Sequence, residues 1–396
     1  MHIGFRGFLR RCVATAIASA LALVPMMGGA VAGPYLLVDL KSGEVIAENQ
    51  SFDPWYPASI TKLMTTYVTL KAVASGELYG DSGVPMTAAA ARQPPSKMGF
   101  KPGTVITIDT ALKIIMVKSA NDVAMALGER VGGSLPAFVA RMNAEARALG
   151  MVGTHFDNAN GLPSPGQYTT ARDYAILARA LLREFPAYRD LYHITALSLG
   201  GKVIPNHNNL LERYPGADGM KTGFICAAGF NVVASASRNG RQVLAVVLGG
   251  ETAKARDELA AKLFEYAFQS PNSHSGITLD SLRPRAAVAS APADMHDLAC
   301  PKKRNKKAVT EDLGDDDDAG DAGKTASYLV PRFKVMDPIP IVLGGARDMP
   351  VATPAVVTPA AAAASSRDLA FASADLPPLP LPNPLRTGKL RGAATR

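Results

Sequence analysis

Apolar and polar residues follow a strand-like pattern where the globular part of the chain begins. Apolar runs at Tyr35–Leu40 and Val45–Glu48 are separated by Lys41-Ser42-Gly43-Glu44, which predicts two strands joined by a turn. Further along, Pro57 suits the first turn of a helix. Apolar residues then recur at helical spacing, at Ile60, Leu63, Met64, Tyr67 and Val68. The pattern therefore predicts that a helix follows the second strand.

The end of the globular part combines strands and a helix again. The β-rich runs Phe230–Ser237 and Gln242–Leu248 flank Arg238-Asn239-Gly240-Arg241, a strong hairpin signal, and Ala253–Phe268 has the apolar spacing of a helix. The region between, Ala111–Phe185, is mostly helical by pattern. We therefore predict an α/β (α+β) fold, in which an antiparallel sheet is flanked by terminal helices and carries an inserted helical region. A cleft between the two parts is the natural place for a ligand.

The first residues have the pattern of an export signal. Arg6, Arg10 and Arg11 precede the apolar run Cys12–Met27, and Ala30-Val31-Ala32 supplies the small residues that a signal peptidase recognises. At 16 residues the run is shorter than the roughly 20 that a membrane-spanning helix needs. We interpret residues 1–32 as a signal peptide, which predicts a periplasmic or cell-envelope protein, with a retained N-terminal anchor as the alternative.

Composition changes after the globular part, which we assign to residues 33–270. Residues 271–396 hold 15 of the 29 prolines, a basic cluster at Lys302–Lys307 and an acidic one at Asp315–Asp318. Such a segment cannot bury enough apolar surface to offset its chain entropy, so we expect a largely disordered tail. Within it, Tyr328–Leu343 is apolar enough to dock as a short strand.

Charge and cysteine content exclude several functions. The 42 Lys and Arg against 34 Asp and Glu give a net charge of +8, to which the signal peptide contributes, so the sequence gives no reason to expect a nucleic-acid partner. None of the metal-binding Cys or His spacings occurs, and we expect no metal and no cofactor. Removal of the signal peptide leaves Cys226 and Cys300, whose pairing stays open at this point.

The first candidate motif is Ser59-Ile60-Thr61-Lys62. Residues three apart on a helix share a face, so the hydroxyl of Ser59 and the amine of Lys62 can meet. A serine becomes a nucleophile when a base removes its proton, and a lysine acts as that base only when burial or a second cation lowers its pKa. Taken alone, this spacing is equally compatible with an exposed lysine on a helix.

The second motif is Ser119-Ala120-Asn121, at the end of an apolar segment. Ser119 could relay a proton to a departing amine, and Asn121 could hold the substrate backbone or Lys62. The alternative is a helix cap, a position that favours both residue types.

The third motif is Lys221-Thr222-Gly223. A cation and a hydroxyl on an edge strand, followed by a glycine that lets a substrate approach the backbone, would make a carboxylate clamp. Lys221 could also supply the second cation near Lys62, and a surface lysine before a turn is the alternative.

In this order the three motifs are those of penicillin-interactive enzymes, and the chain resembles the serine D-Ala-D-Ala carboxypeptidases among the low-molecular-mass penicillin-binding proteins. The resemblance covers about Tyr35–Phe268 and includes longer family-like stretches: Tyr56–Thr65, Asn121–Ala124, His155–Asp173 and Asn208–Gly223. Family members often have His-Thr after the third motif, where this chain has Phe224-Ile225-Cys226. We interpret Cys226 as a packed thiol, and His155, His193 and His207 as structural residues. The family's second domain and amphipathic anchor are not recognisable in the tail, so membrane association has no support there.

The resemblance implies an acyl-enzyme cycle on peptidoglycan stem peptides. Ser59 would attack the carbonyl between the last two D-alanines, with Lys62 as base and Ser119 as the group that protonates the leaving D-alanine. The backbone N–H groups of Ser59 and Phe224 would form the oxyanion hole. Lys221 and Thr222 would hold the terminal carboxylate, beside Gly223, and β-lactams would acylate the same serine.

Three other functions share parts of this pattern. A D,D-endopeptidase that cuts cross-links differs in the shape of its site rather than in these residues. A β-lactamase should carry a Glu-x-x-Leu-Asn segment between the second and third motifs, which is absent. A non-catalytic wall-binding protein would have no need of the intact Ser59 and Lys62. The carboxypeptidase is thus the main prediction and the endopeptidase the principal alternative.

Overall fold

The computed structural model describes residues 33–270, 275–301 and 327–346. Its elements are β1 (Tyr35–Asp39), β2 (Val45–Asn49), η1 (Ala58–Thr61), α1 (Lys62–Ala74), β3 (Gly83–Pro85), α2 (Ala88–Ala91), β4 (Val105–Thr107), α3 (Ile108–Val117), α4 (Asn121–Gly132), α5 (Leu135–Ala148), α6 (Ala171–Glu184), η2 (Pro186–His193), β5 (Ala196–Leu199), β6 (Lys202–Pro205), α7 (Leu210–Arg213), β7 (Ala217–Ile225), β8 (Gly229–Arg238), β9 (Arg241–Gly250), α8 (Ala253–Gln269), α9 (His296–Ala299) and β10 (Ile339–Pro340). The predicted signal peptide and the charged clusters of the predicted tail lie outside the described residues.

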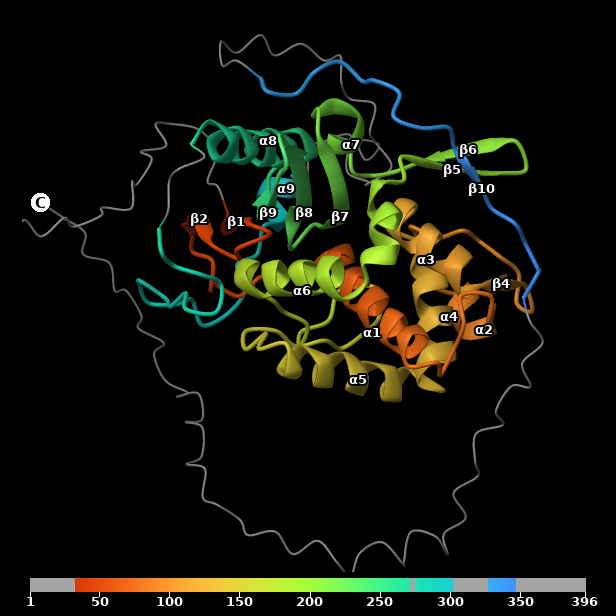
Figure 1. Ribbon diagram of the computed structural model, residues 1–396. Coiled ribbons are helices and arrows are strands. Elements are labelled where there is room, and N and C mark those ends of the chain that lie inside the picture. The colour runs from red at the N-terminus through yellow and green to blue at the C-terminus, as the bar shows by residue number, and fades with distance from the viewer. Residues whose placement is uncertain (1–32, 271–274, 302–326, 347–396) are drawn as a thin grey trace, which may run out of the picture. The chain divides into compact units, whose positions relative to one another are not determined.

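The framework is a five-stranded antiparallel sheet in the order β2-β1-β9-β8-β7 (Figure 1). Strands β8 and β9 form the hairpin expected from the sequence, and Arg238 pairs with Arg241 across the turn. The turn residues Asn239 and Gly240 have φ values of 51° and 76°, as a tight hairpin turn requires. The predicted antiparallel sheet with an inserted helical region is confirmed, and β7 lies at its edge.

Helices cover both faces of the sheet (Figure 1). Helix α8, whose first turn is capped by the Thr252 hydroxyl accepting the Ala255 N–H, packs on β8 and β9 around Phe264. On the other face, α6 packs against β1 and β9, and the larger apolar core continues from there into the inserted helices α1, α3, α4 and α5. Helix α1, the helix predicted to follow the second strand, packs against α4, α5 and α6.

Part of the predicted tail is ordered against the domain. In the segment 275–301, the backbone of Thr278 forms an isolated antiparallel β-bridge with that of Glu44, and the side chains of Leu279 and Leu282 are buried. The segment ends in a disulfide between Cys226 and Cys300, whose Cα atoms are 5.5 Å apart. For these residues the structure differs from the expectation of a disordered tail, and Cys226 is not the packed free thiol that we expected.

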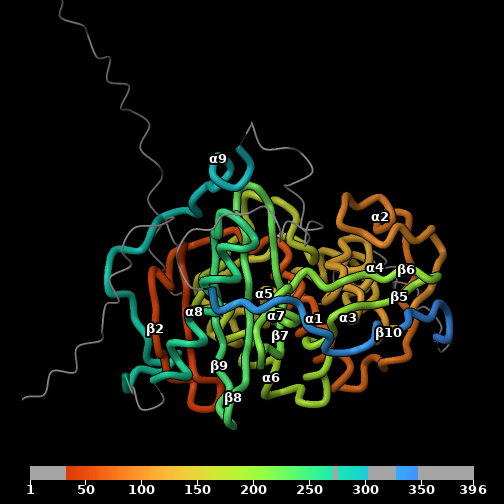
Figure 2. The backbone as a smooth tube through the Cα atoms, turned by 90° about the horizontal axis from the view of Figure 1, so that it is seen from above, coloured from red at the N-terminus to blue at the C-terminus, as the bar shows by residue number. Residues whose placement is uncertain are grey.

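The segment 327–346 runs across the domain as an extended strap (Figure 2). Its Val330 N–H donates to the Arg213 carbonyl, and β10 pairs in parallel with β5, with Ile339 opposite Leu197. A short strand within Tyr328–Leu343 was expected from apolar content, and β10 is that strand. Its partner β5 could not be identified from the sequence, because neither strand has a distinctive pattern.

An ion pair between Arg238, at the end of β8, and Glu265, on α8, makes the free energy of unfolding depend on pH. Arg238 donates two hydrogen bonds to Glu265, of 2.7 and 3.1 Å, and Tyr214 donates a third. The hydrogen bonds from Arg238 hold the pKa of Glu265 below its usual value, although burial acts in the opposite direction. A lowered pKa means that the carboxylate stabilises the fold at neutral pH and loses this contribution as the pH falls below about 4.5.

We therefore expect Glu265→Gln to lower the melting temperature at pH 7 by about 2 °C, corresponding to about 1 kcal/mol for a partly buried pair. The difference from the native chain should shrink as the pH is lowered from about 5 to 3, because the native carboxylate becomes protonated too. Thermal unfolding followed by circular dichroism at several pH values measures this. A difference that stays constant over that range would contradict the assigned pKa direction.

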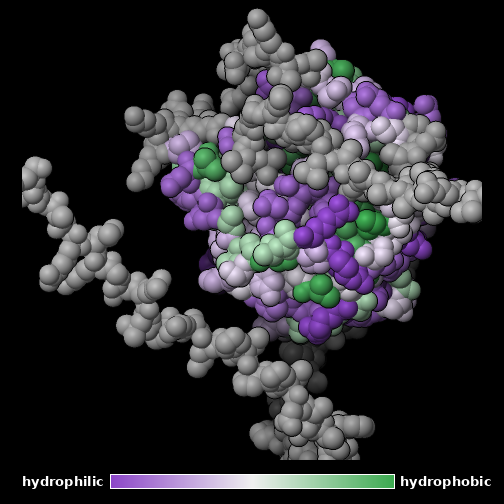
Figure 3. Space-filling view, turned by 90° about the vertical axis from the view of Figure 1, so that its left-hand side faces the viewer, coloured by the Kyte–Doolittle hydropathy of each residue, from purple (hydrophilic) through white to green (hydrophobic). Residues whose placement is uncertain are grey.

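In the described part of the chain no helix combines the length and the apolar character needed to cross a membrane. The same part holds no group of three His, Cys, Asp or Glu residues arranged to bind a metal ion. The face that lies on the left-hand side in Figure 1 mixes hydrophilic residues with small, separate hydrophobic spots where described residues are visible (Figure 3).

Candidate active site

Ser59 and Lys62 meet where the 3-10 turn η1 passes into α1. Lys62 Nζ donates hydrogen bonds to Ser59 Oγ at 2.9 Å, to Asn121 Oδ1 at 2.9 Å and to the Asn160 carbonyl at 2.6 Å. Ser59 lies in η1 rather than in the predicted α-helix, and side chains three apart eclipse one another in a 3-10 turn. The lysine is fully buried, whereas the serine is partly exposed. The structure thus brings a reachable hydroxyl against an amine held by three oxygen atoms.

The side chain of Asn231 fixes the backbone before Ser59. Asn231 on β8 donates from Nδ2 to the carbonyls of Tyr56 and Pro57, at 3.0 and 3.2 Å, and accepts the Gly249 N–H. Ala58 has a φ of 48°, a conformation that is uncommon for a residue with a side chain. Such strain persists only where the surrounding structure enforces it, and it is frequent at functional sites.

Ser119 lies in the short turn between α3 and α4, directly before Ala120, the N-cap residue of α4. It has a φ of 60°, and its fully buried Oγ has no hydrogen-bond partner within the part of the chain that is described. The cap of α4 is Ala120, without a side-chain bond, so neither Ser119 nor Asn121 serves as the helix cap considered above. Buried hydroxyls are normally satisfied, and one held in a strained backbone is a candidate for contact with a substrate.

Asn121 connects this turn to Lys62 and to the loop 92–100. Its backbone N–H donates to the Ser96 carbonyl at 2.7 Å, and its Nδ2 donates to the Pro94 carbonyl at 3.1 Å. With both donors used by that loop, the remaining oxygen Oδ1 points at Lys62 Nζ. The orientation of the amide is therefore determined by its neighbours.

The third motif lies on the edge strand β7. Lys221 and Thr222 are 1 % exposed, Lys221 Nζ donates to the Thr222 carbonyl at 2.9 Å, and Thr222 Oγ1 is buried without a partner among the described residues. A Cβ at Gly223 would lie 2.9 Å from the backbone nitrogens of Ser59 and Ile60, so only glycine lets β7 approach η1 this closely. Phe224 is half-buried and stacks on Phe230 with ring centroids 4.2 Å apart. All eight predicted site residues thus lie on η1, α1, α4, β7 or the turn before α4.

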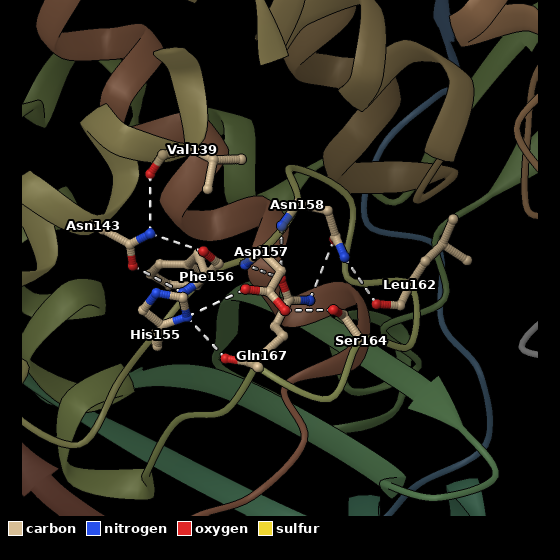
Figure 4. A network of polar contacts seen from close by, with 10 residues as sticks. Val139, Asn143, His155, Phe156, Asp157, Asn158, Leu162, Ser164 and Gln167 are labelled. Carbon is tan, nitrogen blue, oxygen red and sulfur yellow. Dashed lines mark hydrogen bonds and ion pairs between the residues drawn. The ribbon is translucent and has the colours of Figure 1, made fainter. Parts of the chain in front are cut away.

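A loop that the sequence analysis did not include in the site supplies the Asn160 carbonyl that accepts from Lys62. Figure 4 shows other polar contacts of this loop, around Asp157, Asn158 and Gln167. Asn158 Oδ1 accepts the N–H groups of Asn160 and Gly161, and Gln167 Oε1 accepts those of Asp157 and Asn158. Gly161 has a φ of 88°, and a Cβ there would lie 1.9 Å from the Ala58 carbonyl oxygen. The loop therefore presses its backbone against the residue before Ser59, with the Asn160 carbonyl directed at the lysine.

His155, which we interpret as a structural residue, belongs to this loop. His155 Nδ1 is 2.8 Å from the Gly166 carbonyl and 3.3 Å from Asp157, so it closes the same loop (Figure 4). The Asn160 carbonyl itself could not be found from side-chain chemistry. The signal available was the family-like stretch His155–Asp173, to which no role had been given.

A serine hydroxyl bonded to a lysine amine, beside an antiparallel sheet with an inserted helical region, defines the class of penicillin-interactive serine enzymes. The family model described as D-alanyl-D-alanine carboxypeptidase (Peptidase S11) matches residues 25–252. The chain belongs to this family.

Among curated relatives, the chain is 35% identical over 259 residues to D-alanyl-D-alanine carboxypeptidase DacD of Salmonella typhimurium, covering 64% of this chain and 66% of that protein. It is 35% identical over 254 residues to DacA of Escherichia coli, covering 62% and 63%. The matched regions thus span slightly less than two thirds of these relatives.

Solved structures of members of this family are similar to the chain as well. The DacD structure from Francisella tularensis superposes with a TM-score of 0.59 at 32% identity, over 61% of this chain and 71% of that one. Penicillin-binding protein D2 of Listeria monocytogenes, solved in an ampicillin-bound form, superposes with a TM-score of 0.55 at 29% identity, over 60% and 97%.

Proposed function

We propose that the protein is a serine-type D-alanyl-D-alanine carboxypeptidase that removes the terminal D-alanine from peptidoglycan stem peptides. The observation that carries the proposal is the hydrogen bond between Lys62 Nζ and Ser59 Oγ, in a chain that belongs to the carboxypeptidase family. Family membership favours this function over the β-lactamase and over the non-catalytic wall-binding protein. No separate observation favours the endopeptidase, which remains an outcome of the test.

Acylation needs a neutral Lys62 amine and nearby hydrogen-bond donors for the oxyanion that develops on the attacked carbonyl. Ser59 Oγ attacks the carbonyl of the penultimate D-alanine, its proton passes to Lys62 Nζ, and a bond forms between Oγ and the carbonyl carbon. The carbonyl oxygen gains negative charge, which the backbone N–H groups of Ser59 and Phe224 stabilise. Ser119 then gives its proton to the amide nitrogen and takes one in turn from the Lys62 ammonium, so that the peptide bond breaks, D-alanine leaves and the amine is neutral again.

Deacylation repeats the sequence with water. Lys62 takes a proton from the water molecule as its oxygen attacks the ester, and Ser59 leaves with that proton. Asn121 and the Asn160 carbonyl hold the amine in place in both steps. A β-lactam follows the first half of this path, and the ampicillin-bound form of the Listeria protein supports the same chemistry here.

Stem peptides of the cell wall lie outside the cytoplasm, so the proposal requires export. The basic and apolar pattern of residues 1–32 supports a signal peptide and a periplasmic or cell-envelope location. Cysteines that pair, as Cys226 and Cys300 do, suit such an oxidising compartment.

The proposal is tested by incubating the exported chain with a labelled penicillin and, separately, with a pentapeptide that ends in D-Ala-D-Ala. Release of D-alanine together with stable labelling of Ser59 is the expected result. Rapid turnover of penicillin, or cleavage of cross-linked peptide dimers without release of D-alanine, would overturn the proposal and identify a β-lactamase or an endopeptidase instead.

We expect Lys221→Ala to weaken recognition of the terminal carboxylate. Loss of a buried charge-assisted contact corresponds to about 2 kcal/mol, so KM for a peptide ending in a free acid should rise roughly 30-fold. KM for the matching C-terminal amide, which carries no charge, should change much less. Steady-state kinetics on the two peptides measure the split, and equal changes for acid and amide would rule out the clamp.

A further inference from the structure

The disulfide joins a distant part of the chain to the end of the strand that carries the third motif. Cys226 begins the turn between β7 and β8, three positions after Gly223, and Cys300 directly follows α9. The Met295 N–H also donates to the carbonyl of Ala227 in that turn, at 3.0 Å. Met295, the N-cap residue of α9, and Ala299, its last residue, are buried. The segment 295–300 is therefore held against the turn by a covalent bond and a backbone hydrogen bond, and two of its apolar side chains are buried.

The roles proposed for β7 give the substrate a direction. The terminal carboxylate lies against Lys221 and Thr222, and the attacked carbonyl lies at the N–H of Phe224. The peptide consequently runs antiparallel to β7, and towards its own N-terminus it advances towards higher residue numbers of the strand. One residue of extended chain spans about 3.3 Å on both strands, so the residue before the two D-alanines falls opposite Ile225, the last residue of β7 and the neighbour of Cys226.

The outer edge of β7 is available for such pairing. Strand β7 is the last in its sheet, and within the described residues no strand pairs with its other edge. Ile225, Cys226 and Ala227 are partly exposed, in contrast to the buried Lys221 and Thr222. An extended peptide that pairs with an exposed strand edge gains backbone hydrogen bonds only where that edge is held in an extended, fixed form.

We propose that the Cys226–Cys300 disulfide and the segment 295–300 hold the end of β7 and the β7–β8 turn as the subsite for the substrate residue that precedes the D-Ala-D-Ala pair. This inference rests on the proposed function. The cysteines act as positioning residues, because they fix the turn without touching the reacting atoms. Without the disulfide, the turn must be ordered each time a substrate binds, which weakens binding but leaves the chemistry at Ser59 unchanged.

The experiment compares two substrates on the full exported chain. One is N-acetyl-D-Ala-D-Ala, which ends before the proposed subsite, and the other is a stem pentapeptide, which fills it. We expect Cys226→Ser/Cys300→Ser to raise KM for the pentapeptide roughly tenfold, with kcat nearly unchanged. KM for the dipeptide should change less than about twofold. Treatment of the native chain with a phosphine reductant should reproduce this pattern and should not affect the double variant.

Controls separate positioning from loss of folded protein. Labelled penicillin counts the active sites in each sample, so rates refer to folded enzyme only. Leu329→Ala, in the core beside α8 and on the other side of the sheet, serves as a destabilised variant with an intact disulfide. Met295→Ala loosens the segment while keeping the disulfide, and it should show the pentapeptide effect to a smaller degree.

Equal changes for both substrates, or no change for either, would overturn the inference while penicillin labelling and D-alanine release remain intact. The same selective pattern in Leu329→Ala would overturn it as well, because destabilisation alone would then suffice. If the native chain neither binds penicillin covalently nor releases D-alanine, the proposed function itself is refuted.

Discussion

Replacement of Ser59 by alanine is expected to lower D-alanine release by at least about 10⁴-fold and to abolish covalent labelling by penicillin. The Ser59 hydroxyl oxygen is the atom that forms the acyl-enzyme, and it accepts a hydrogen bond from Lys62 Nζ, the group that takes its proton. The other two acceptors are an amide oxygen and a backbone carbonyl, which are not nucleophiles. Release of D-alanine and incorporation of labelled penicillin are measured on the same preparation.

The fold should survive this substitution. Ser59 is partly exposed, and Lys62 keeps two of its three acceptors when the hydroxyl is removed. Ser75→Ala, at the far end of α1, is a matched control in which a serine that donates to a backbone carbonyl is lost away from the site. We expect both variants to melt within a few degrees of the native chain. Penicillin labelling retained by Ser59→Ala would refute the assigned nucleophile.

The features predicted best from sequence are those that local patterns determine. The β8–β9 hairpin was expected within two residues of its ends, because Asn239-Gly240 specifies a tight turn and the flanking residues are β-formers. Helix α8 was expected from Ala253 to Phe268 and ends at Gln269. Its start is clear because Thr252 is a good cap.

The features that were missed depend on tertiary neighbours. The disulfide requires two Cα atoms within about 7 Å, which a sequence separation of 74 residues does not reveal. Two further features could not be predicted from the sequence: the pairing of β10 with β5 and the docking of residues 275–301. The composition of both segments resembles that of a disordered tail. The segments bury few side chains each and are held largely by backbone hydrogen bonds, such as that from Val45 to the Ile277 carbonyl.

Within the candidate site, too, some groups could be predicted from the sequence and one could not. Side chains with distinctive chemistry, such as Ser59, Lys62 and Lys221, could be chosen because their order is characteristic. The third oxygen on Lys62 is a main-chain atom of Asn160, and any residue could supply it. What the sequence does encode there is the means of holding that carbonyl, namely Asn158, Gly161 and Gln167.

Removal of the Lys62 amine should be nearly as damaging as loss of Ser59. We expect Lys62→Met, which keeps the volume but cannot accept a proton, to slow acylation by penicillin by at least about 10³-fold. The buried oxygens of Asn121 and Asn160 lose a donor, at roughly 1 to 3 kcal/mol each, so the melting temperature should also fall. Lys62→Met also removes the energetic cost of burying an amine, and this offsets part of the loss of stability.

Two measurements distinguish a base from a residue that only supports the structure. Rapid mixing separates the initial non-covalent binding of penicillin from the acylation that follows, and Lys62→Met should leave the first within about threefold while the second collapses. Lys71→Met, on the exposed side of the same helix and paired with Glu145, loses a lysine without touching the site and should acylate at the native rate. Parallel losses of binding and acylation in Lys62→Met would mean that the amine holds the site together rather than taking the proton of Ser59. The three oxygens around Nζ would then be the contacts of a structural cation, and the hydroxyl would need another base.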